Sequence, residues 1–226
     1  MALYAIADTH LSFGTDKPMD SFPGWNDYVQ RIENNWNKLV TDDDTVVIAG
    51  DISWAMNFDE LKADFEFLNN LKGTKLILKG NHDYWWNTAK KMNEFIDENG
   101  FDSIKILFNN SYTVDGVSVC GSRGWMFDGE DEHDERVLSR EVGRLRLSLE
   151  SAECDDKVVF LHYPPITTDS KCEEILSVLK EYGIKKCYYG HLHGKAAKIA
   201  LDDEIDGIQF RLISCDRLSF IPKLVR

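Results

Sequence analysis

The sequence predicts an α/β fold in which two sheets pack together with helices on the outside. Short apolar or β-branched runs alternate with helical patterns along the first hundred residues. Hairpin-like segments separate this block from a second β-α-β block and also follow that second block. The chain has 226 residues, of which 43% are hydrophobic and 29% charged, as in a typical globular protein. We therefore expect a single domain that spans residues 1–226.

The first block is predicted to be β-α-β-α-β. Buried strands are expected at residues 2–7, 45–49 and 75–79, where the chain is apolar or β-branched. Between these runs, apolar side chains recur at helical spacing. They are Val29, Ile32, Trp36 and Val40 in the first helix and Leu61, Phe65 and Leu68 in the second.

The remaining elements are predicted in the same way. A helix at 88–98 leads to strands at 104–108, 112–114 and 117–120, where the turn "VDGV" signals a hairpin and an antiparallel middle region. The second block contains a helix at 135–152, a strand at 157–162, a helix at 173–182 and a strand at 185–189. The tail, from about residue 196, alternates again and is expected to form a hairpin.

Charge and cysteine content restrict the possible partners and compartments. The formal net charge of −13 would repel nucleic acid and anionic membrane surfaces, so neither is expected as a partner. The five cysteines form no C-x-x-C pair, which favours reduced, buried thiols in a cytoplasmic protein. The N-terminus has no basic leader and its apolar run ends at Asp8, so neither a signal peptide nor a membrane span is expected. The run at 128–136 indicates a solvated acidic loop, with metal binding through His133 as the alternative.

Five of the six histidines stand at the ends of predicted strands, beside glycine or polar residues. The segments concerned are "ADTH", "AGD", "KGNHD", "FLHY" and "YGHLHG". Side chains at the carboxyl ends of strands in an open α/β sheet converge on a common crevice. One such residue is usually a hydrogen-bonded loop residue, but five strand ends with this chemistry indicate a shared partner that satisfies buried polar groups.

Imidazole and carboxylate ligands without thiolate suit Mn, Fe, Co, Ni or Zn in a reactive centre. Seven residues are too many for one tetrahedral ion and suit two ions that share a bridging carboxylate. The candidates are Asp8, His10, Asp51, Asn81, His162, His191 and His193.

The motif series D-x-H, G-D, G-N-H-[DE], H and G-H-x-H resembles the calcineurin-like metallophosphoesterase superfamily. It reads "DTH" at 8–10, "GD" at 50–51, "GNHD" at 80–83, His162 and "GHLH" at 190–193, in the family's order. The resemblance covers most of the chain and implies a four-layer α/β/β/α sandwich of two mixed sheets flanked by helices. This architecture agrees with the two-sheet pattern.

The resemblance also implies a role for each motif residue. Asp8, His10, Asp51 and His193 would hold one metal ion, and Asp51, Asn81, His162 and His191 the other, with Asp51 as the bridge. His82 would face the substrate and protonate the leaving group, and Asp83 would orient the His82 imidazole. Two divalent ions, with Mn favoured, would generate a bridging hydroxide that attacks a phosphoester.

The chain departs from the protein phosphatase branch of this family. That branch reads G-D-x-V-D-R-G at the second motif, whereas this chain reads "GDISWAM" and lacks the arginine that helps to clamp phosphate. Arg123 could replace it, or could be an ordinary loop residue. Trp54, Trp85 and Trp125 are candidates for a substrate-facing aromatic wall, with core packing as the alternative. Residues 11–25, which follow His10, could form a lid or an inert connector.

These observations favour a hydrolase that acts on a small-molecule or nucleotide phosphodiester. A phosphomonoesterase and a pyrophosphohydrolase would use the same centre. A non-catalytic metal-binding scaffold predicts gaps in the motif series, and none is found. A dinuclear hydrolase of lactones or amides would not need the acid His82. The oligomeric state is left open by the sequence.

Overall fold

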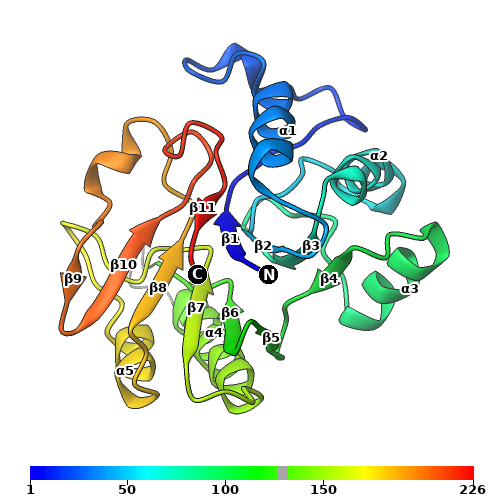
Figure 1. Cartoon of the computed structure of the whole chain (residues 1–226). Coiled ribbons are helices and arrows are strands. Elements are labelled where there is room, and N and C mark those ends of the chain that lie inside the picture. Colours follow the sequence, from blue (N-terminus) through cyan, green and yellow to red (C-terminus); the bar gives the residue numbers. More distant parts are fainter. Residues whose placement is uncertain (127–131) are drawn as a thin grey trace.

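The computed structural model describes residues 1–126 and 132–226, and its strands form two sheets (Figure 1). The first sheet has the order β11-β1-β2-β3-β4. Its strands are β1 (Leu3–Ile6), β2 (Thr45–Ala49), β3 (Thr74–Leu78), β4 (Ile104–Ile106) and β11 (Lys223–Leu224). The second sheet has the order β5-β6-β7-β8-β10-β9. Its strands are β5 (Tyr112–Val114), β6 (Val117–Ser122), β7 (Lys157–Leu161), β8 (Lys186–Tyr189), β9 (Glu204–Ile205) and β10 (Ile208–Leu212).

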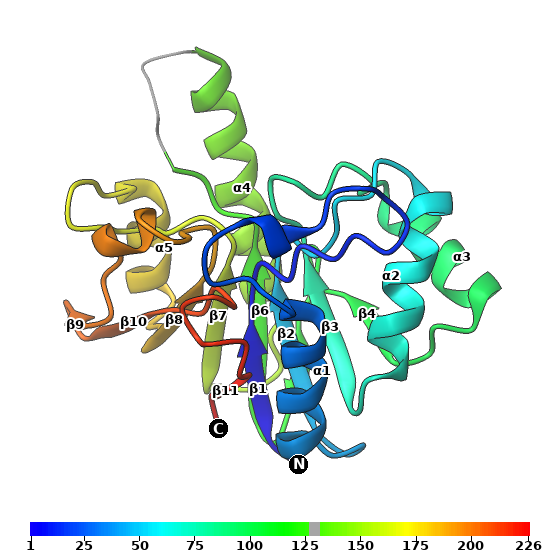
Figure 2. The same cartoon turned by 90° about the horizontal axis from the view of Figure 1, so that it is seen from above.

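Helices cover the outer face of each sheet (Figures 1 and 2). The first sheet is covered by α1 (Tyr28–Leu39), α2 (Phe58–Asn70) and α3 (Ala89–Asn99). The second sheet is covered by α4 (Glu132–Glu150) and α5 (Glu173–Glu181). Two 3₁₀ helices, η1 (Met19–Ser21) and η2 (Ala196–Ile199), lie in connections. The four-layer α/β/β/α sandwich of two mixed sheets is therefore confirmed.

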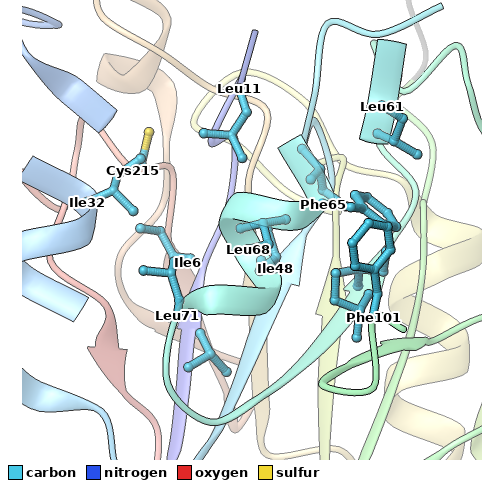
Figure 3. Packing of buried hydrophobic residues seen from close by; sticks show 14 of the residues in the cluster. Ile6, Leu11, Ile32, Ile48, Leu61, Phe65, Leu68, Leu71, Phe101 and Cys215 are labelled. Carbon is cyan, nitrogen blue, oxygen red and sulfur yellow. The ribbon is translucent and has the colours of Figure 1, made fainter. Parts of the chain in front are cut away.

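The layers follow from strands that are apolar on both faces. In β2, Val46 and Ile48 pack under the helices of the first sheet, whereas Val47 and Ala49 face the second sheet. Successive side chains of a strand point to opposite faces, so a continuous apolar run can serve two cores at once. Figure 3 shows the outer core of the first sheet, where Phe65 and Leu68 of α2 lie over Ile48.

Three details of the predicted topology are wrong. The middle of the chain is antiparallel only in the β5–β6 hairpin, because α3 carries the chain across to place β4 parallel to β3. In the tail, residues 196–199 form η2 instead of a strand, and only β9 and β10 make the expected hairpin. The short strand β11, which pairs antiparallel with β1, was not predicted at all.

The described residues also test the predictions for the cysteines and for membrane-spanning helices. All five thiols are free, and every one except Cys154 is buried, as predicted. Among the helices described, none has both the length and the apolar character that crossing a bilayer requires. Of the expected acidic loop at 128–136, residues 128–131 and the side chains of Glu132 and His133 lie outside the described residues, whereas the backbone of residues 132–136 belongs to α4 instead of a loop.

The topology brings the carboxyl ends of the central strands to one edge of the sandwich. Strands β1, β2 and β3 are parallel, and so are β6, β7, β8 and β10. A bridge between Ala7 and Ser214 links the two sheets just beyond the ends of β1 and β10. The loops after these strands therefore meet.

Candidate metal centre

Seven nitrogen- and oxygen-bearing side chains gather where these loops meet. They form two groups of potential ligands, Asp8 with His10 and His193, and Asp51 with His162 and His191. Within each group, one donor atom per residue lies within 4.8 Å of the others. The seventh, Asn81, contacts two histidines of the second group.

The backbone at this centre adopts conformations that side chains rarely accept. Asp8, His10, Asp51 and His191 have φ angles of 61°, 43°, 50° and 72°. Such left-handed residues cost free energy, and they persist where the surrounding structure over-determines them. Their concentration in four of the seven candidate ligands marks the centre as a built site.

Two motif glycines allow the loops to approach one another. A Cβ on Gly80 would lie 2.1 Å from Oδ1 of Asp51, and a Cβ on Gly190 would lie 2.6 Å from Oδ2 of Asp8. Both distances are impossible for real atoms, so only glycine fits at these positions. The glycines therefore set how closely the ligand-bearing loops pack.

In the first group, a carboxylate outside the group holds one histidine. Nδ1 of His193 lies 3.3 Å from Oδ1 of Asp216, whose other oxygen accepts a hydrogen bond from the Gly194 N–H at 2.9 Å. This leaves Nε2 of His193 directed at the centre, 3.3 Å from Oδ1 of Asp8 and 3.3 Å from Nε2 of His10. A carboxylate behind a metal-binding imidazole is a common arrangement that fixes its orientation.

In the second group, hydrogen bonding fixes the tautomer of His162. Nδ1 of His162 lies 3.1 Å from the carbonyl oxygen of Ala49, which can only accept, so Nδ1 carries the proton. Burial lowers the pKa of His162, so its ring is neutral and Nε2 keeps a lone pair. That lone pair faces Oδ1 of Asn81 at 2.6 Å, and the same oxygen lies 2.9 Å from Nδ1 of His191. Two acceptors this close to each other fit a cation that binds both.

Asp51 lies between the two groups. Its Oδ1 is 3.5 Å from Nε2 of His162, and its Oδ2 is 3.8 Å from Nε2 of His10. One carboxylate oxygen thus faces each group, as a bridging ligand requires. The Oδ1 atom also accepts the His82 N–H at 2.8 Å, which fixes the carboxylate.

The pKa shifts of the side chains at this centre show that its buried carboxylates favour a positive charge close by. Burial, together with the negative charge of Asp8, raises the pKa of Asp51 to about 7. Burial lowers the pKa of His10 to about 3 and of His191 to about 4. Against the effect of burial, Asp8 and Asp216 raise the pKa of His193 to about 10.

The donor set fits divalent metal ions. It consists of carboxylate oxygens, an amide oxygen and imidazole nitrogens, with no thiolate, as Mn, Fe, Co, Ni and Zn accept in reactive centres. Two ions would explain two observations together. The acceptor atoms of His162 and Asn81 face each other, and Asp51 lies between the two ligand groups.

The structure contradicts the predicted contact between Asp83 and the His82 imidazole. The Asp83 carboxylate instead accepts the N–H groups of Asp51, Ile52, Ser53 and Gly80 and the indole N–H of Trp85. Nδ1 of His82 is buried and has no hydrogen-bond partner among the described residues. Adjacent side chains in this turn point in different directions. Asp83 therefore links the loops after β2 and β3 through hydrogen bonds and does not contact the His82 imidazole.

His82 and Trp54 face an apolar cavity beside the first group. It has a volume of about 550 Å³ and is called the apolar cavity from here on. Its lining includes His10, Met19, Phe22, Trp25, Trp54, His82 and His193. The Trp54 ring stacks on His10 with 4.8 Å between ring centroids and lies 4.7 Å from the His82 ring. The prediction for Trp54 thus fits its position at the cavity.

Trp85 does not reach the cavity. It is only 3% exposed, packs edge-on against Phe65 with 5.3 Å between centroids, and donates its indole N–H to Asp83. The core alternative therefore describes Trp85, and a contact with substrate is unavailable to it.

Arg123 and Trp125 lie on the other side of the centre. The Arg123 guanidinium pairs with Glu141 of α4 at 3.4 Å and lies over the Trp125 ring at 4.8 Å. Trp125 contacts Tyr163, the neighbour of His162, with 5.2 Å between centroids. Neither side chain borders the apolar cavity, and the phosphate clamp by Arg123 stays a prediction.

Sequence reasoning missed Asp216 and Trp25. Asp216 follows the last strand of the second sheet and obeys the same rule as the other strand-end residues, so it could have been found. Trp25 lies within the predicted lid segment and its ring is 5.6 Å from His193. It gave no signal in the sequence because its place at the cavity depends on how the loop folds back.

The fold and the two groups of potential ligands together define an α/β/β/α protein with a candidate metal centre. The calcineurin-like phosphoesterase family model matches residues 1–195, so the chain belongs to that family, whose members bind divalent metals. A Methanocaldococcus jannaschii protein, the uncharacterized protein MJ1445, is 27% identical over 132 residues, which are 56% of this chain and 67% of that protein.

Solved structures share the fold at low sequence identity. The phosphopantetheinyl hydrolase PptH of Mycobacterium tuberculosis has a TM-score of 0.59 at 17% identity, over 99% of this chain and 95% of that chain. The protein AQ665 of Aquifex aeolicus, of unknown function, has a TM-score of 0.54 at 18% identity over the same shares of both chains.

Proposed function

We propose that this protein is a phosphohydrolase that cleaves a small phosphoester at a dinuclear metal centre. The observation that carries the proposal is the pair of buried donor groups with Asp51 between them, one carboxylate oxygen facing each group. Two divalent ions bound there, for which Mn²⁺ is our first choice, supply a hydroxide nucleophile at neutral pH and neutralise charge on the phosphoryl group.

The chain's own residues then have distinct roles in this proposal. Asp8, His10, Asp51 and His193 hold one ion, and Asp51, Asn81, His162 and His191 hold the other. His82 lies at the edge of the apolar cavity and donates a proton or a hydrogen bond to the departing oxygen. Burial lowers the pKa of His82, so the imidazolium that can donate a proton is the minor form at neutral pH, whereas the neutral ring can donate only a hydrogen bond.

The apolar cavity favours a phosphodiester with a flat or apolar alcohol group. Its walls offer the faces of Trp54 and the side chains of Met19, Phe22 and Trp25, so a leaving group bound there would be largely removed from water. A bare phosphomonoester of a small alcohol would leave these walls uncovered. Monoesters and pyrophosphates remain alternatives at the same centre.

The test is hydrolysis by metal-stripped protein refilled with Mn²⁺. Bis(p-nitrophenyl) phosphate, p-nitrophenyl phosphate and a phosphopantetheinyl ester, the last suggested by the name of the structural neighbour PptH, form the substrate panel. We expect the diester to be cleaved faster than the monoester, and Asp51→Asn to abolish the cleavage. The matched control is Asp42→Asn, the same change at an exposed residue, which should behave as wild type.

Two results would change the proposal. Faster cleavage of the monoester would reassign the protein as a phosphomonoesterase. Two bound Mn²⁺ ions per chain with no hydrolysis of any ester in the panel would favour the non-catalytic scaffold.

A further inference from the structure

A second cavity, with basic walls, lies on the α4 side of the centre. This cavity, which we call the basic pocket, has a volume of about 300 Å³. Its polar lining consists of Lys79, Arg123, Trp125, Arg140, Glu141 and Arg144. Such a concentration of cations is unexpected in a chain with a net charge of −13.

The charges in the basic pocket do not balance. Of the described residues that line the pocket, four are cationic and one, Glu141, is a buried carboxylate, so their formal sum is 4 − 1 = +3. Oε1 of Glu141 lies 2.6 Å from Arg144 and 3.4 Å from Arg123. Among the described residues, Lys79 and Arg140 have no carboxylate partner. A single buried carboxylate needs fewer cations than this.

Two hydrogen-bond donors in the basic pocket also lack acceptors. Nε of Arg123 and Nε1 of Trp125 are buried and have no partner in the part of the chain that the structure describes. An unpaired buried donor costs free energy, as does the i, i+4 spacing of two arginines, Arg140 and Arg144, on one helix. Both costs would be offset by an oxyanion, which accepts several hydrogen bonds and carries negative charge.

The basic pocket borders the second ligand group. Lys79 stands two residues before Asn81, and the Arg123 carbonyl accepts the N–H of His162 at 3.1 Å. Trp125 contacts Tyr163, whose ring lies 4.4 Å from the ring of His191. The apolar cavity borders the first group through His10 and His193. The two cavities therefore flank the centre.

We propose that the basic pocket binds a phosphate-type oxyanion. The ligand is either a second anionic group of the substrate, held while another phosphoryl group reacts at the centre, or free inorganic phosphate. The first assignment rests on the proposed function, because it places the pocket in the substrate-binding surface. Binding itself does not depend on catalysis and can be measured separately.

The first experiment counts bound phosphate by calorimetry on the full chain loaded with Mn²⁺. We expect two phosphates per chain in the wild type, one at the metal ions and one in the basic pocket. The double variant Lys79→Met with Arg140→Gln should bind one, with metal content and circular dichroism unchanged. The matched control is Arg146→Gln on the same helix, because Arg146 pairs with Glu181 at 2.6 Å and does not line the pocket.

A second variant tests the role of Glu141. Glu141→Gln raises the formal charge of the pocket from +3 to +4 and should tighten phosphate binding several-fold. If the arginines are present only to neutralise Glu141, the pocket of the wild type will bind no phosphate and only this variant will bind one there. That result, together with unchanged phosphate stoichiometry in the double variant, would overturn the proposal.

A pair of substrates separates the two sources of the anion. Thymidine 5′-(p-nitrophenyl phosphate) is compared with the same ester carrying a 3′-phosphate. If the pocket binds a substrate group, the double variant should change the ratio of the two KM values about tenfold. An unchanged ratio, with the second phosphate lost in calorimetry, would assign the pocket to free phosphate. Two bound phosphates without hydrolysis of either ester would support the pocket and contradict the proposed function.

Discussion

Asp216 shows how one carboxylate outside the ligand set prepares a histidine inside it. The Asp216 oxygen lies 3.3 Å from Nδ1 of His193, so the Nε2 lone pair is directed toward Asp8 and His10. The same carboxylate accepts the Gly194 N–H, which holds the loop after β8 in place. Asp216 is therefore a positioning residue in our proposal.

Replacing Asp216 with Asn should weaken metal binding without unfolding the chain. The amide has almost the same shape but loses the charge that orients and polarises His193, an effect that typically costs 10–100-fold in metal affinity. Titration of the metal-stripped variant with Mn²⁺ measures this loss. An affinity equal to that of the wild type would show that Asp216 serves the loop alone.

Replacing His82 should reduce the rate of hydrolysis most for an ester with a poor leaving group. His82→Ala should slow hydrolysis of a methyl p-nitrophenyl phosphodiester little, because p-nitrophenolate leaves readily without a proton. A dialkyl phosphodiester needs help at the departing oxygen, and its hydrolysis should slow by ~10²–10⁴-fold. Steady-state rates on both esters give the comparison, and an equal loss on the two would assign His82 to substrate binding.

At the scale of elements, the strands and the meeting of their loops were predictable, whereas side-chain directions were not. Short apolar or β-branched runs and strand-end histidines predicted the sheets and the segments that converge. Asp83 and Trp85 were misassigned because adjacency in sequence does not fix where a side chain points within a turn. The sequence left open whether Arg123 is a phosphate clamp or an ordinary loop residue, because the direction of its side chain depends on its ion pair with Glu141 of α4.

The segment after His10 is tied to α2 by Asp64. Oδ1 of Asp64 accepts the Phe13 N–H at 2.7 Å, and its Oδ2 bonds with the hydroxyl of Ser53. Gly14 lies so close to the α2 backbone that a Cβ would lie 1.9 Å from the Glu60 carbonyl oxygen. The first part of the predicted lid is thus anchored, and any opening would have to occur beyond residue 14.

This anchor predicts a pH dependence of stability. Burial raises the pKa of Asp64 from 3.8 to about 6, so between these values the folded chain keeps a proton that the unfolded chain releases. The contribution of Asp64 to the free energy of unfolding should therefore fall by about 2–3 kcal/mol as pH rises from 4 to 6. Asn at this position can keep both hydrogen bonds and does not titrate.

Urea unfolding of wild type and Asp64→Asn in EDTA, at several pH values, isolates this contribution. The stability of the variant relative to the wild type should increase across the interval from pH 4 to 6 and then stay constant. Other carboxylates titrate equally in both proteins and cancel in the difference. A difference that does not change with pH would show that Asp64 is ionised throughout.

At the scale of the whole molecule, the candidate ligands come from both sheets. Asp8, Asp51 and Asn81 follow strands of the first sheet, whereas His162 and His191 follow strands of the second. The apolar layer between the sheets holds them together, but at the edge where the loops meet this layer gives way to buried carboxylates and imidazoles. Metal ions bound there would join the two sheets at their most polar contact.

Metal removal should therefore lower thermal stability as well as activity. An ion that binds only the folded chain, at a free concentration 100 times its Kd, adds about 2.7 kcal/mol to the free energy of unfolding. For a chain of this size that corresponds to a rise of roughly 5–10 °C in Tm for each filled site. Scanning calorimetry of the metal-stripped chain with and without Mn²⁺ measures the shift.

The variants show whether the shift arises at this centre. Asp51 has one carboxylate oxygen facing each group, so Asp51→Asn should lose most of the rise in Tm. His82→Ala removes a neighbouring imidazole that we do not assign to a metal ion, and it should keep the rise. Equal shifts in Tm in the two variants would mean that Mn²⁺ stabilises the fold by binding at another site. The two sheets would then be held together by the apolar layer between them alone.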